Sequence, residues 1–511
     1  MRKAEFWFFA CLPIRRECMQ DIIKINEDDQ VAVALKFLKK GKKVSLLDQE
    51  IIVKEDIPQG HKFAIVDMKA GSPVMKYGAC IGYAKSDIPM GAWVHVHNLK
   101  TSLSDLCEYE YYPVTSLNKD EAPATFLGYK RENGKVGVRN EIWIVPTVGC
   151  VNSVAKAMEI AAKNALVLNN VDDIVAFAHP YGCSQMGEDQ EATRNVLADI
   201  AKHPNAGGVL LVGLGCENCN LSVMEEYIDD RKENVYFLQC QDFEDEIEEG
   251  VRLLKKLYNK AETFEREECS SAELIIGMKC GGSDGLSGIT ANPIVGTFSD
   301  MLIGTGGTTI LTEVPEMFGA ETILMNRCKN KEVFNKTVSL INDFKSYFKS
   351  HNQTIYENPS PGNKEGGIST LEDKSLGCTQ KSGIAPVVDV LKYAEIVKEK
   401  GLNLLSAPGN DLVATTALAV SGAQIVLFTT GRGTPFASLV PTIKISSNTT
   451  LSKKKKNWID FDAGELVEDK SKEQLSKELF DFVLKVASGE KVKSEMAGYH
   501  DIAIFKQGVT L

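Results

Sequence analysis

From about residue 126 the chain alternates short apolar segments with amphipathic ones, and this alternation limits the folds open to it. The segments 141–146, 174–178 and 208–213 have the length and apolar content of buried strands, and the stretches between them have helical spacing. Strands that alternate with helices of this length predict parallel βαβ units. We therefore expect an α/β fold with mostly parallel sheets.

The first hundred residues differ from the rest in their hydrophobic pattern. Short runs that alternate apolar and polar residues, at 43–47, 51–54 and 63–66, are separated by glycines, which is typical of a small β-rich domain. A chain of 511 residues is also too long for one ordinary core. The predicted boundaries are an extension (1–18) that is disordered or not translated, a β-rich domain (19–110), a linker (111–125), a second domain of α/β type (126–265) and a C-terminal α/β domain (272–511).

The charge and the cysteines narrow the functions open to the chain. A formal net charge of −11 argues against nucleic acid or an anionic membrane as the main partner, but it permits a small anionic substrate in a locally basic pocket. The 13 cysteines are spread along a long chain, as in reduced cytosolic proteins. No apolar run reaches the roughly 20 residues of a membrane helix. We expect a cytoplasmic protein, and we leave a homo-oligomeric state open.

Three cysteines stand beside glycines directly after predicted strands: Cys183, Cys216 and Cys280. In open parallel sheets the binding crevice lies at the carboxyl ends of the strands. Thiolates are ligands for iron or zinc, and three of them leave a fourth position open for a substrate. The alternative is that all three are small residues buried under loops, as free cysteines usually are.

Three histidines of the β-rich domain are candidate metal ligands or proton carriers. His61 follows a glycine, and His95 and His97 occupy alternate positions of a predicted strand at 93–99. Side chains two residues apart in a strand point to the same face, so the pair can share a metal ion. Surface histidines without a function are the plainer alternative.

Further polar residues stand at the same strand ends or in glycine-rich loops. His179, Glu217 and Asp284 lie in the three cysteine-bearing segments and are, together with His61, the candidate catalytic groups. Arg432 follows a predicted strand and can clamp a carboxylate, although arginines in surface loops are common. The other candidate substrate-binding residues are Ser283, Asn363 and Lys381.

Two weaker signals complete the set. Glu313, Glu316 and Glu321 are candidate bases, though carboxylates in the first turn of a helix explain some of them. The segment 213–218 begins like a dinucleotide-binding loop, but an asparagine occupies the position of the third glycine. A nicotinamide-dependent reaction is therefore disfavoured.

Four segments, 128–140, 146–152, 279–293 and 429–435, resemble motifs of the altronate and galactarate dehydratase family. The resemblance covers essentially residues 19–511. It implies an N-terminal domain of the SAF type, two α/β domains and a divalent iron or manganese ion. It also implies a reaction that removes water from a sugar acid.

Within that family, three further segments look like the altronate branch: 93–98, 311–321 and 372–381. The resemblance makes His95, His97 and Cys378 features of this branch. The residues that look like chemistry shared by both branches are His61, His179, Cys183, Cys216 and Cys280.

The resemblance also suggests where the chemistry takes place. We expect Fe²⁺ or Mn²⁺ between the SAF-type domain and the second domain, near His61 and one or more of the three strand-end cysteines. Arg432 or Lys381 would hold the substrate. An iron–sulfur cluster on the three cysteines is the less favoured alternative. The alternatives for the function are a galactarate dehydratase, a sulfolactate-type lyase and a non-catalytic sugar-acid sensor.

Overall fold

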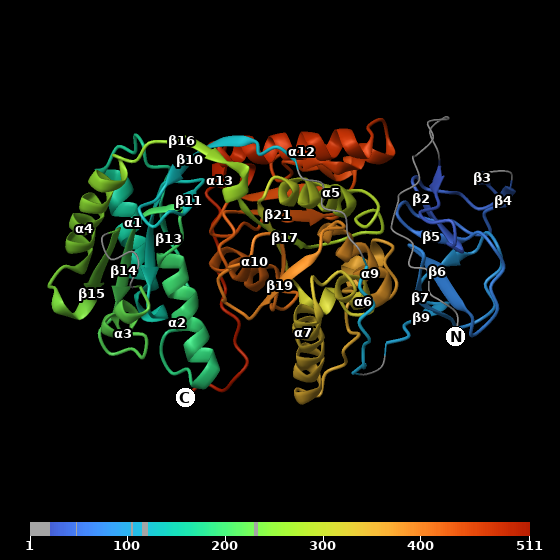
Figure 1. The fold of residues 1–511 in the computed structure, drawn as a ribbon, viewed down its shortest axis with the longest axis horizontal. Coiled ribbons are helices and arrows are strands. Elements are labelled where there is room, and N and C mark those ends of the chain that lie inside the picture. Colours follow the sequence, from blue (N-terminus) through green and yellow to red (C-terminus); the bar gives the residue numbers. More distant parts are fainter. Residues whose placement is uncertain (1–20, 47–48, 104–105, 115–120, 229–233) are drawn as a thin grey trace.

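A computed structural model describes residues 21–46, 49–103, 106–114, 121–228 and 234–511. The predicted extension and residues 115–120 of the predicted linker lie outside this part. Three bodies stand in a row, with the C-terminal domain in the middle, the N-terminal domain at one end and the second domain at the other (Figure 1). Within the described part, no helix is both long and apolar enough to cross a membrane.

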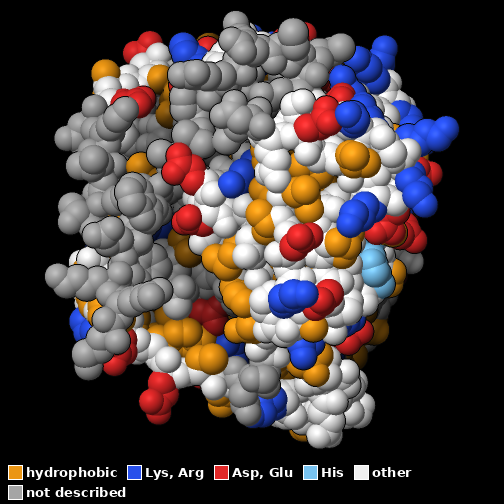
Figure 2. Space-filling view, turned by 90° about the vertical axis from the view of Figure 1, so that its right-hand side faces the viewer, with side chains coloured by type: hydrophobic (Ala, Val, Ile, Leu, Met, Phe, Trp, Pro, Cys, Tyr) orange, Lys and Arg blue, Asp and Glu red, His pale blue; other side chains and the backbone are white. Residues whose placement is uncertain are grey.

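The N-terminal domain consists of short antiparallel strands, as its glycine-punctuated sequence predicts. Its three sheets have the strand orders β1-β2-β5-β8, β3-β4 and β6-β7-β9. Seen from this end, acidic, basic and apolar side chains all lie on the visible surface (Figure 2). The strands are β1 (Ile22–Ile23), β2 (Val31–Ala34), β3 (Lys43–Leu46), β4 (Gln49–Ile52), β5 (Lys62–Ala64), β6 (Pro73–Lys76), β7 (Ala79–Ala84), β8 (Trp93–Val94) and β9 (Leu99–Lys100).

The predicted strand 93–99 is wrong. Strand β8 ends at Val94, and residues 95–98 form a turn in which the N–H groups of Asn98 and Leu99 donate to His95 O at 3.0 and 2.9 Å. The turn removes the two-residue alternation on which a shared face for His95 and His97 depends.

The second domain has a four-stranded parallel sheet in the order β13-β12-β14-β15. Alternate residues of the strands pack against α1 and α4 on one face and against α2 and α3 on the other. The elements are β12 (Glu141–Pro146), α1 (Asn152–Ala165), β13 (Ile174–Ala176), α2 (Gly187–Ala201), β14 (Ala206–Gly213), α3 (Leu221–Glu226), β15 (Val235–Gln239) and α4 (Glu246–Ala261), with 3-10 turns η1 (Gly149–Val151) and η3 (Cys240–Asp242).

A small antiparallel sheet joins the second domain to the C-terminal one. Strand β10 (Thr125–Lys130) pairs with β11 (Val136–Gly137) on one side and with β16 (Glu267–Ser270) on the other. Strand β16 lies in the charged segment that the sequence marks as a boundary, where its exposed glutamates hide the strand pattern.

The C-terminal domain is built on a seven-stranded parallel sheet in the order β19-β20-β18-β17-β21-β22-β23. Helices α5, α7 and α12 pack on one face, and α10 packs between the other face and α2 of the second domain. The strands are β17 (Ile275–Cys280), β18 (Thr308–Leu311), β19 (Val387–Leu391), β20 (Leu402–Leu405), β21 (Ile425–Thr430), β22 (Thr442–Ser446) and β23 (Phe461–Asp462).

The helices of this domain follow the expected strand–helix alternation. The α-helices are α5 (Ala291–Gly304), α6 (Glu321–Met325), α7 (Lys331–Ser350), α8 (Pro361–Glu365), α9 (Leu371–Thr379), α10 (Asp411–Val420), α11 (Thr449–Lys454), α12 (Lys472–Ala487) and α13 (Lys493–Met496), and the 3-10 turns are η4 (Ser271–Glu273), η5 (Val314–Glu316), η6 (Gln380–Ser382) and η7 (Ala463–Val467). The two parallel sheets confirm the predicted fold class.

Candidate active site

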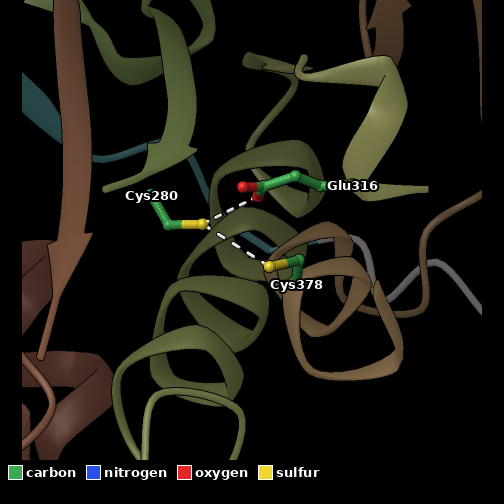
Figure 3. A group of neighbouring side chains, drawn as sticks. All are labelled: Cys280, Glu316 and Cys378. Carbon is green, nitrogen blue, oxygen red and sulfur yellow. Dashed lines mark hydrogen bonds between the residues drawn. The ribbon is translucent and has the colours of Figure 1, made fainter. Parts of the chain in front are cut away.

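Reactive side chains gather at the carboxyl ends of the two central strands of the seven-stranded sheet. Cys280 ends β17, Glu316 lies in η5 just after β18, and Cys378 comes from α9, which packs alongside (Figure 3). The Sγ atom of Cys280 lies 2.9 Å from Glu316 Oε2 and 3.5 Å from Cys378 Sγ. All three side chains are buried. Among the described residues, this is the group of three potential metal ligands whose donor atoms all lie within 4.8 Å of one another.

Two buried lysines set the charge of this group. Lys374 Nζ lies 2.6 Å from Glu316 Oε1, and Lys381 is buried within range of both thiols. Burial opposes the ionised form of Glu316, but the two lysines outweigh it and lower the pKa to about 2. The hydrogen bond with Cys378, aided by the lysines, lowers the pKa of Cys280 to about 6, while the same hydrogen bond and burial raise the pKa of Cys378. The pair of thiols therefore loses its first proton more readily than an isolated thiol, and the hydrogen bond between the two sulfur atoms stabilises the thiolate.

Glu313 adds a second carboxyl group, whose pKa is shifted in the opposite direction to that of Glu316. Its φ of +70° lies in the left-handed region, which is uncommon for a residue with a side chain and is found at functional sites. Its Oε2 accepts a hydrogen bond from Cys280 N at 2.9 Å, and Lys279 Nζ lies 3.1 Å from Oε1. Burial and the neighbouring Glu316 raise the pKa of Glu313 well above its usual value, despite Lys279.

The loop after β17 forms the wall beside this group. Asp284 accepts hydrogen bonds from Ser287, Ser447 and Asn448 side chains and from the N–H groups of Leu286 and Ser287, so it organises the loop. Its carboxylate has no oxygen without a donor.

Two predicted substrate-binding residues lie next to Asp284. Asn363 donates from Nδ2 to Ser283 O at 2.9 Å, and its Oδ1 lies 3.4 Å from Lys374 Nζ. The Ser283 hydroxyl is buried and makes no hydrogen bond with the described residues. The wall thus offers one unused hydroxyl next to the cationic Lys374.

The N-terminal domain covers the site and is held by buried charges. Lys62 and Lys76 place their Nζ atoms 2.8 and 2.9 Å from the two oxygens of Asp373, which precedes Lys374 in α9. The fit is close, because a Cβ at Gly285 would come within 1.9 Å of Gly60 O. Between the domains remains a cavity of about 10 Å³, lined among others by Asp373, Lys374, Ser283 and Cys378. A cavity of this size holds about one water molecule.

Two of the three predicted histidines lie in this interface. His61 Nε2 lies 3.1 Å from Glu365 O, and Trp93 donates to its Nδ1 at 3.2 Å, so both ring nitrogens are engaged. The His95 ring lies 5.2 Å from the His61 ring, is buried, and has no hydrogen-bond partner at Nδ1 among the described residues. Burial, with Lys62 and His61, lowers the pKa of His95 to about 3. His97 is exposed.

Arg432 lies at the rim of the interface. Its Nη1 donates to Gly362 O and to the Glu365 carboxylate, both at 3.0 Å, and its side chain is 46% exposed. An exposed ion pair such as that between Arg432 and Glu365 contributes little free energy, so this guanidinium can exchange its partner for an anion that approaches the site.

The structure corrects the predicted placement of the site. The N-terminal domain lies against the C-terminal domain and not against the second domain (Figure 1). Cys183 and Cys216 are exposed on the parallel sheet of the second domain, so they belong to a different sheet from the buried Cys280. His179 and Glu217 accompany them, and both are engaged in hydrogen bonds with their own loops and with residues 146–147 at the end of β12.

Another hollow lies away from these groups. It measures about 530 Å³, is lined by Asn170 of the second domain and by Tyr129 and Arg266 at the joining sheet, among others, and holds none of the predicted site residues. We attach no chemistry to it.

The sequence missed several charged groups of the site. No motif in the sequence marks Lys62, Lys76, Asp373 and Lys374, although a lysine at an inward position of a short apolar strand, as at Lys62, is a usable signal. The segment 372–381 was noted only for Cys378 and Lys381.

Comparison with family models assigns each body of the chain. Residues 20–102 match the altronate/galactarate dehydratase SAF domain, residues 128–262 match the D-galactarate dehydratase/altronate hydrolase second domain, and residues 271–510 match the D-galactarate/altronate dehydratase C-terminal domain. The chain belongs to the D-galactarate/altronate dehydratase family. The resemblance and the SAF-type domain inferred from the motifs are thereby confirmed.

Members of the family with curated names cover nearly the whole chain. Altronate dehydratase of Bacillus subtilis (strain 168) is 54% identical over 96% of this chain and 100% of its own length. Altronate dehydratase of Escherichia coli (strain K12) is 52% identical over 96% of this chain and 99% of its own length. Galactarate dehydratase (L-threo-forming) of Escherichia coli (strain K12) is 33% identical over 94% of this chain and 96% of its own length.

Proposed function

We propose that this protein is a hydro-lyase that removes water from D-altronate to give 2-dehydro-3-deoxy-D-gluconate. The observation that carries the proposal is the identity of 54% and 52%, over almost the full length, with two relatives named altronate dehydratase. The 33% identity with the galactarate enzyme makes galactarate the second candidate substrate. The buried charges under the SAF domain supply a setting for this chemistry.

The difficult step is removal of the C2 proton, because the neighbouring carboxylate is already negative and gains further charge as the proton leaves. Cationic groups preorganised in a water-poor site stabilise such charge strongly. Lys374 and Lys381 are buried and carry raised pKa values, because the nearby thiol and carboxylate groups outweigh burial. We assign these two ammonium groups to the substrate carboxylate, with the Ser283 hydroxyl beside them.

Departure of the C3 hydroxyl requires a proton donor. Glu313 fits this role, since burial and the neighbouring Glu316 raise its pKa and so favour the protonated carboxyl group, and a general acid contributes about 10²- to 10⁴-fold. Its strained backbone and its hydrogen bond from Cys280 N hold the carboxyl group in place.

We assign proton abstraction to His95 rather than to His61. Its Nδ1 has no partner among the described residues and can therefore face a substrate proton. Burial lowers the pKa of the ring to about 3 and keeps it neutral, so the bound substrate anion must raise this pKa for His95 to act as the base. His61 is engaged at both nitrogens and instead fixes the interface.

The donor set fits a divalent metal ion. Cys280, Glu316 and Cys378 would hold it: with both thiols ionised this trio carries three negative charges, and Lys374 and Lys381 balance two of them. Two sulfur ligands favour iron over manganese, which prefers oxygen. When bound, the ion would supply Lewis-acid polarisation of a carboxylate or hydroxyl oxygen.

Substrate entry requires the SAF domain to move. A six-carbon acid cannot enter a cavity of about 10 Å³. Lys62, Lys76 and Asp373 would therefore act as a latch that opens for binding and closes to exclude water from the reacting groups.

The test is anaerobic turnover of a substrate panel by the iron-loaded full-length chain. D-altronate should give the 2-keto-3-deoxy acid with a kcat/KM well above that for galactarate. Turnover of galactarate alone would reverse the assignment. Tight binding of either acid without product would favour the non-catalytic sensor.

We also place the protein in the cytoplasm. The eleven cysteines within the described residues are all free thiols, as a reducing compartment requires. A homo-oligomeric state stays a prediction. The molar mass of the purified protein, measured by light scattering, would check it.

A further inference from the structure

Exposed cysteines follow three neighbouring strands of the second domain. Cys150 comes after β12, Cys183 after β13 and Cys216 after β14, and all three are exposed. Free cysteine is usually one of the most buried residue types. Three exposed thiols at the same edge of one sheet are therefore a feature that packing does not explain, and the proposed dehydration site uses none of them.

The topology makes this edge a binding crevice. In the order β13-β12-β14-β15 the chain moves outward from β12 to β13 and then crosses to β14 on the other side. Helix α1, which follows β12, packs on one face of the sheet, and α3, which follows β14, packs on the other, so the loops after β12 and β14 separate at a switch point. Ligands of open parallel sheets bind at the carboxyl ends of the strands at such a point.

The loops after β12 and β13 are fixed to each other. His179 Nε2 donates to Pro146 O at 2.7 Å, and its Nδ1 accepts from Tyr181 N at 3.2 Å. Gly149 N donates to Tyr181 O at 2.9 Å. Gly182 allows this contact, because it has φ +102° and a Cβ would lie 1.9 Å from Thr147 O. His179 thus holds the loop that carries Cys183.

The loop after β14 is fixed in the same way. Glu217, which is buried, accepts from Thr147 Oγ1 at 2.7 Å and from Gly215 N at 2.7 Å. Cys219 N donates to Gly182 O at 3.0 Å, which ties this loop to the one after β13. His179 and Glu217, singled out in the sequence as catalytic, hold the loops that carry the thiols.

The thiol spacing argues against a single ion bound by all three cysteines. The sulfur atoms of Cys150, Cys183 and Cys216 do not all lie within 4.8 Å of one another, since the buried group around Cys280 is the trio of the described residues that does. A single ion needs its ligands that close, whereas a multi-iron cluster holds its cysteines further apart because each binds a different iron. The Ser184 hydroxyl near Cys183 Sγ, at 3.7 Å, adds a donor to sulfur of the kind that surrounds such clusters.

We propose that the loops after β12, β13 and β14 bind an iron–sulfur cluster through Cys150, Cys183 and Cys216. This cluster is separate from the ligand group at Cys280, Glu316 and Cys378. With three thiolates, a four-iron cluster keeps one iron without a protein ligand.

The test measures the cluster itself and needs no turnover. The full-length protein is reconstituted anaerobically with ferric iron, dithiothreitol and sulfide, desalted, and assayed for iron, acid-labile sulfide, visible absorption and the electron paramagnetic resonance signal after reduction with dithionite. The wild-type chain should bind acid-labile sulfide, an equal number of iron atoms plus the ion of the buried Cys280 group, and show the cluster signals. Cys216→Ser and Cys183→Ser should lose them, and circular dichroism checks their folding.

Two matched variants separate this site from others. Cys107→Ser, at an exposed cysteine outside the second domain, and Cys280→Ser, at the buried group, should both retain the cluster. Absence of acid-labile sulfide from the wild type, iron bound without sulfide, or a cluster that survives in Cys216→Ser and Cys183→Ser would each overturn the proposal.

Discussion

Replacing Asp373 by asparagine should loosen the SAF domain from the C-terminal domain. The substitution keeps the size of the side chain and removes the charge that faces Lys62 at 2.8 Å and Lys76 at 2.9 Å. All three side chains are at most 3% exposed, so the small stabilising free energies of surface ion pairs do not apply here. Loss of one partner of a buried pair costs about 3–5 kcal/mol, because the remaining charge has no counterion.

The two lysines contribute unequally to that cost. Burial lowers the pKa of Lys62 to about 8, although Asp373 opposes it. Without Asp373 its pKa falls further, and once this pKa lies below 7 the amine is neutral at pH 7. Lys62 therefore adds at most about 1.4 kcal/mol to the cost, the equivalent of one pKa unit. Burial also opposes the charge on Lys76, yet Asp373 and Tyr77 raise its pKa. Most of the cost therefore comes from Lys76.

The pH dependence has a definite sign. In the variant, the pKa of each lysine in the folded state would lie below its pKa in the unfolded state. Such a group destabilises the fold at pH values below the unfolded pKa, and the destabilisation shrinks as the pH rises towards that pKa. The stability gap between wild type and variant should therefore narrow from pH 7 to pH 9. In the wild type, Asp373 has a lowered pKa, so its contribution is present above the unfolded value of about 4 and is lost only as pH falls below it.

Urea denaturation, followed by tryptophan fluorescence and circular dichroism, measures this difference. Asp87→Asn is the matched control, because Asp87 pairs with Lys69 on the exposed surface of the same domain and should unfold like the wild type. If Asp373→Asn and Asp87→Asn unfold at the same urea concentration at pH 7, the buried ion pairs of Asp373 do not hold the SAF domain in place.

The remaining predictions concern turnover of D-altronate. Glu313→Gln should lower kcat by about 10²- to 10⁴-fold with iron content unchanged, because it removes the proton donor; a near-normal kcat would assign the acid elsewhere. His95→Ala should lower kcat by about 10²-fold, whereas His97→Ala, at the exposed neighbour, should not; equal effects would contradict the proton-acceptor role. Arg432→Met should raise KM about tenfold and leave kcat nearly unchanged, as for a group that only binds substrate; a lower kcat at constant KM would refute that role.

The sequence predicts the fold well because the fold depends on local periodicity. The apolar strands and amphipathic helices after residue 126 predict both parallel sheets, and the glycine-punctuated runs predict the N-terminal domain. The turn at 95–98 escapes this reasoning, since the segment keeps the alternation of a strand but turns where Asn98 donates to His95 O. Strand β16 escapes it because its exposed positions are glutamates.

The site is predicted only in part, because two sheets offer similar strand ends. The rule that ligands bind at the carboxyl ends of parallel strands points to both the edge that carries Cys280 and the edge that carries Cys216, but it does not say which edge the SAF domain covers. That choice depends on contacts between distant segments, such as Lys62 with Asp373. Glu313 shows a further limit, since its backbone strain and raised pKa arise only in the folded chain.

The most direct test of the account is anaerobic turnover of D-altronate by the iron-loaded full-length chain beside its Glu316→Gln variant. Glu316 links the thiols to Lys374, so its amide form should remain folded and lose most product formation, while the wild type forms the 2-keto-3-deoxy acid. A Glu316→Gln variant as active as the wild type would move the chemistry away from this buried group. A folded, iron-loaded wild type that forms no product from D-altronate would contradict the proposed function.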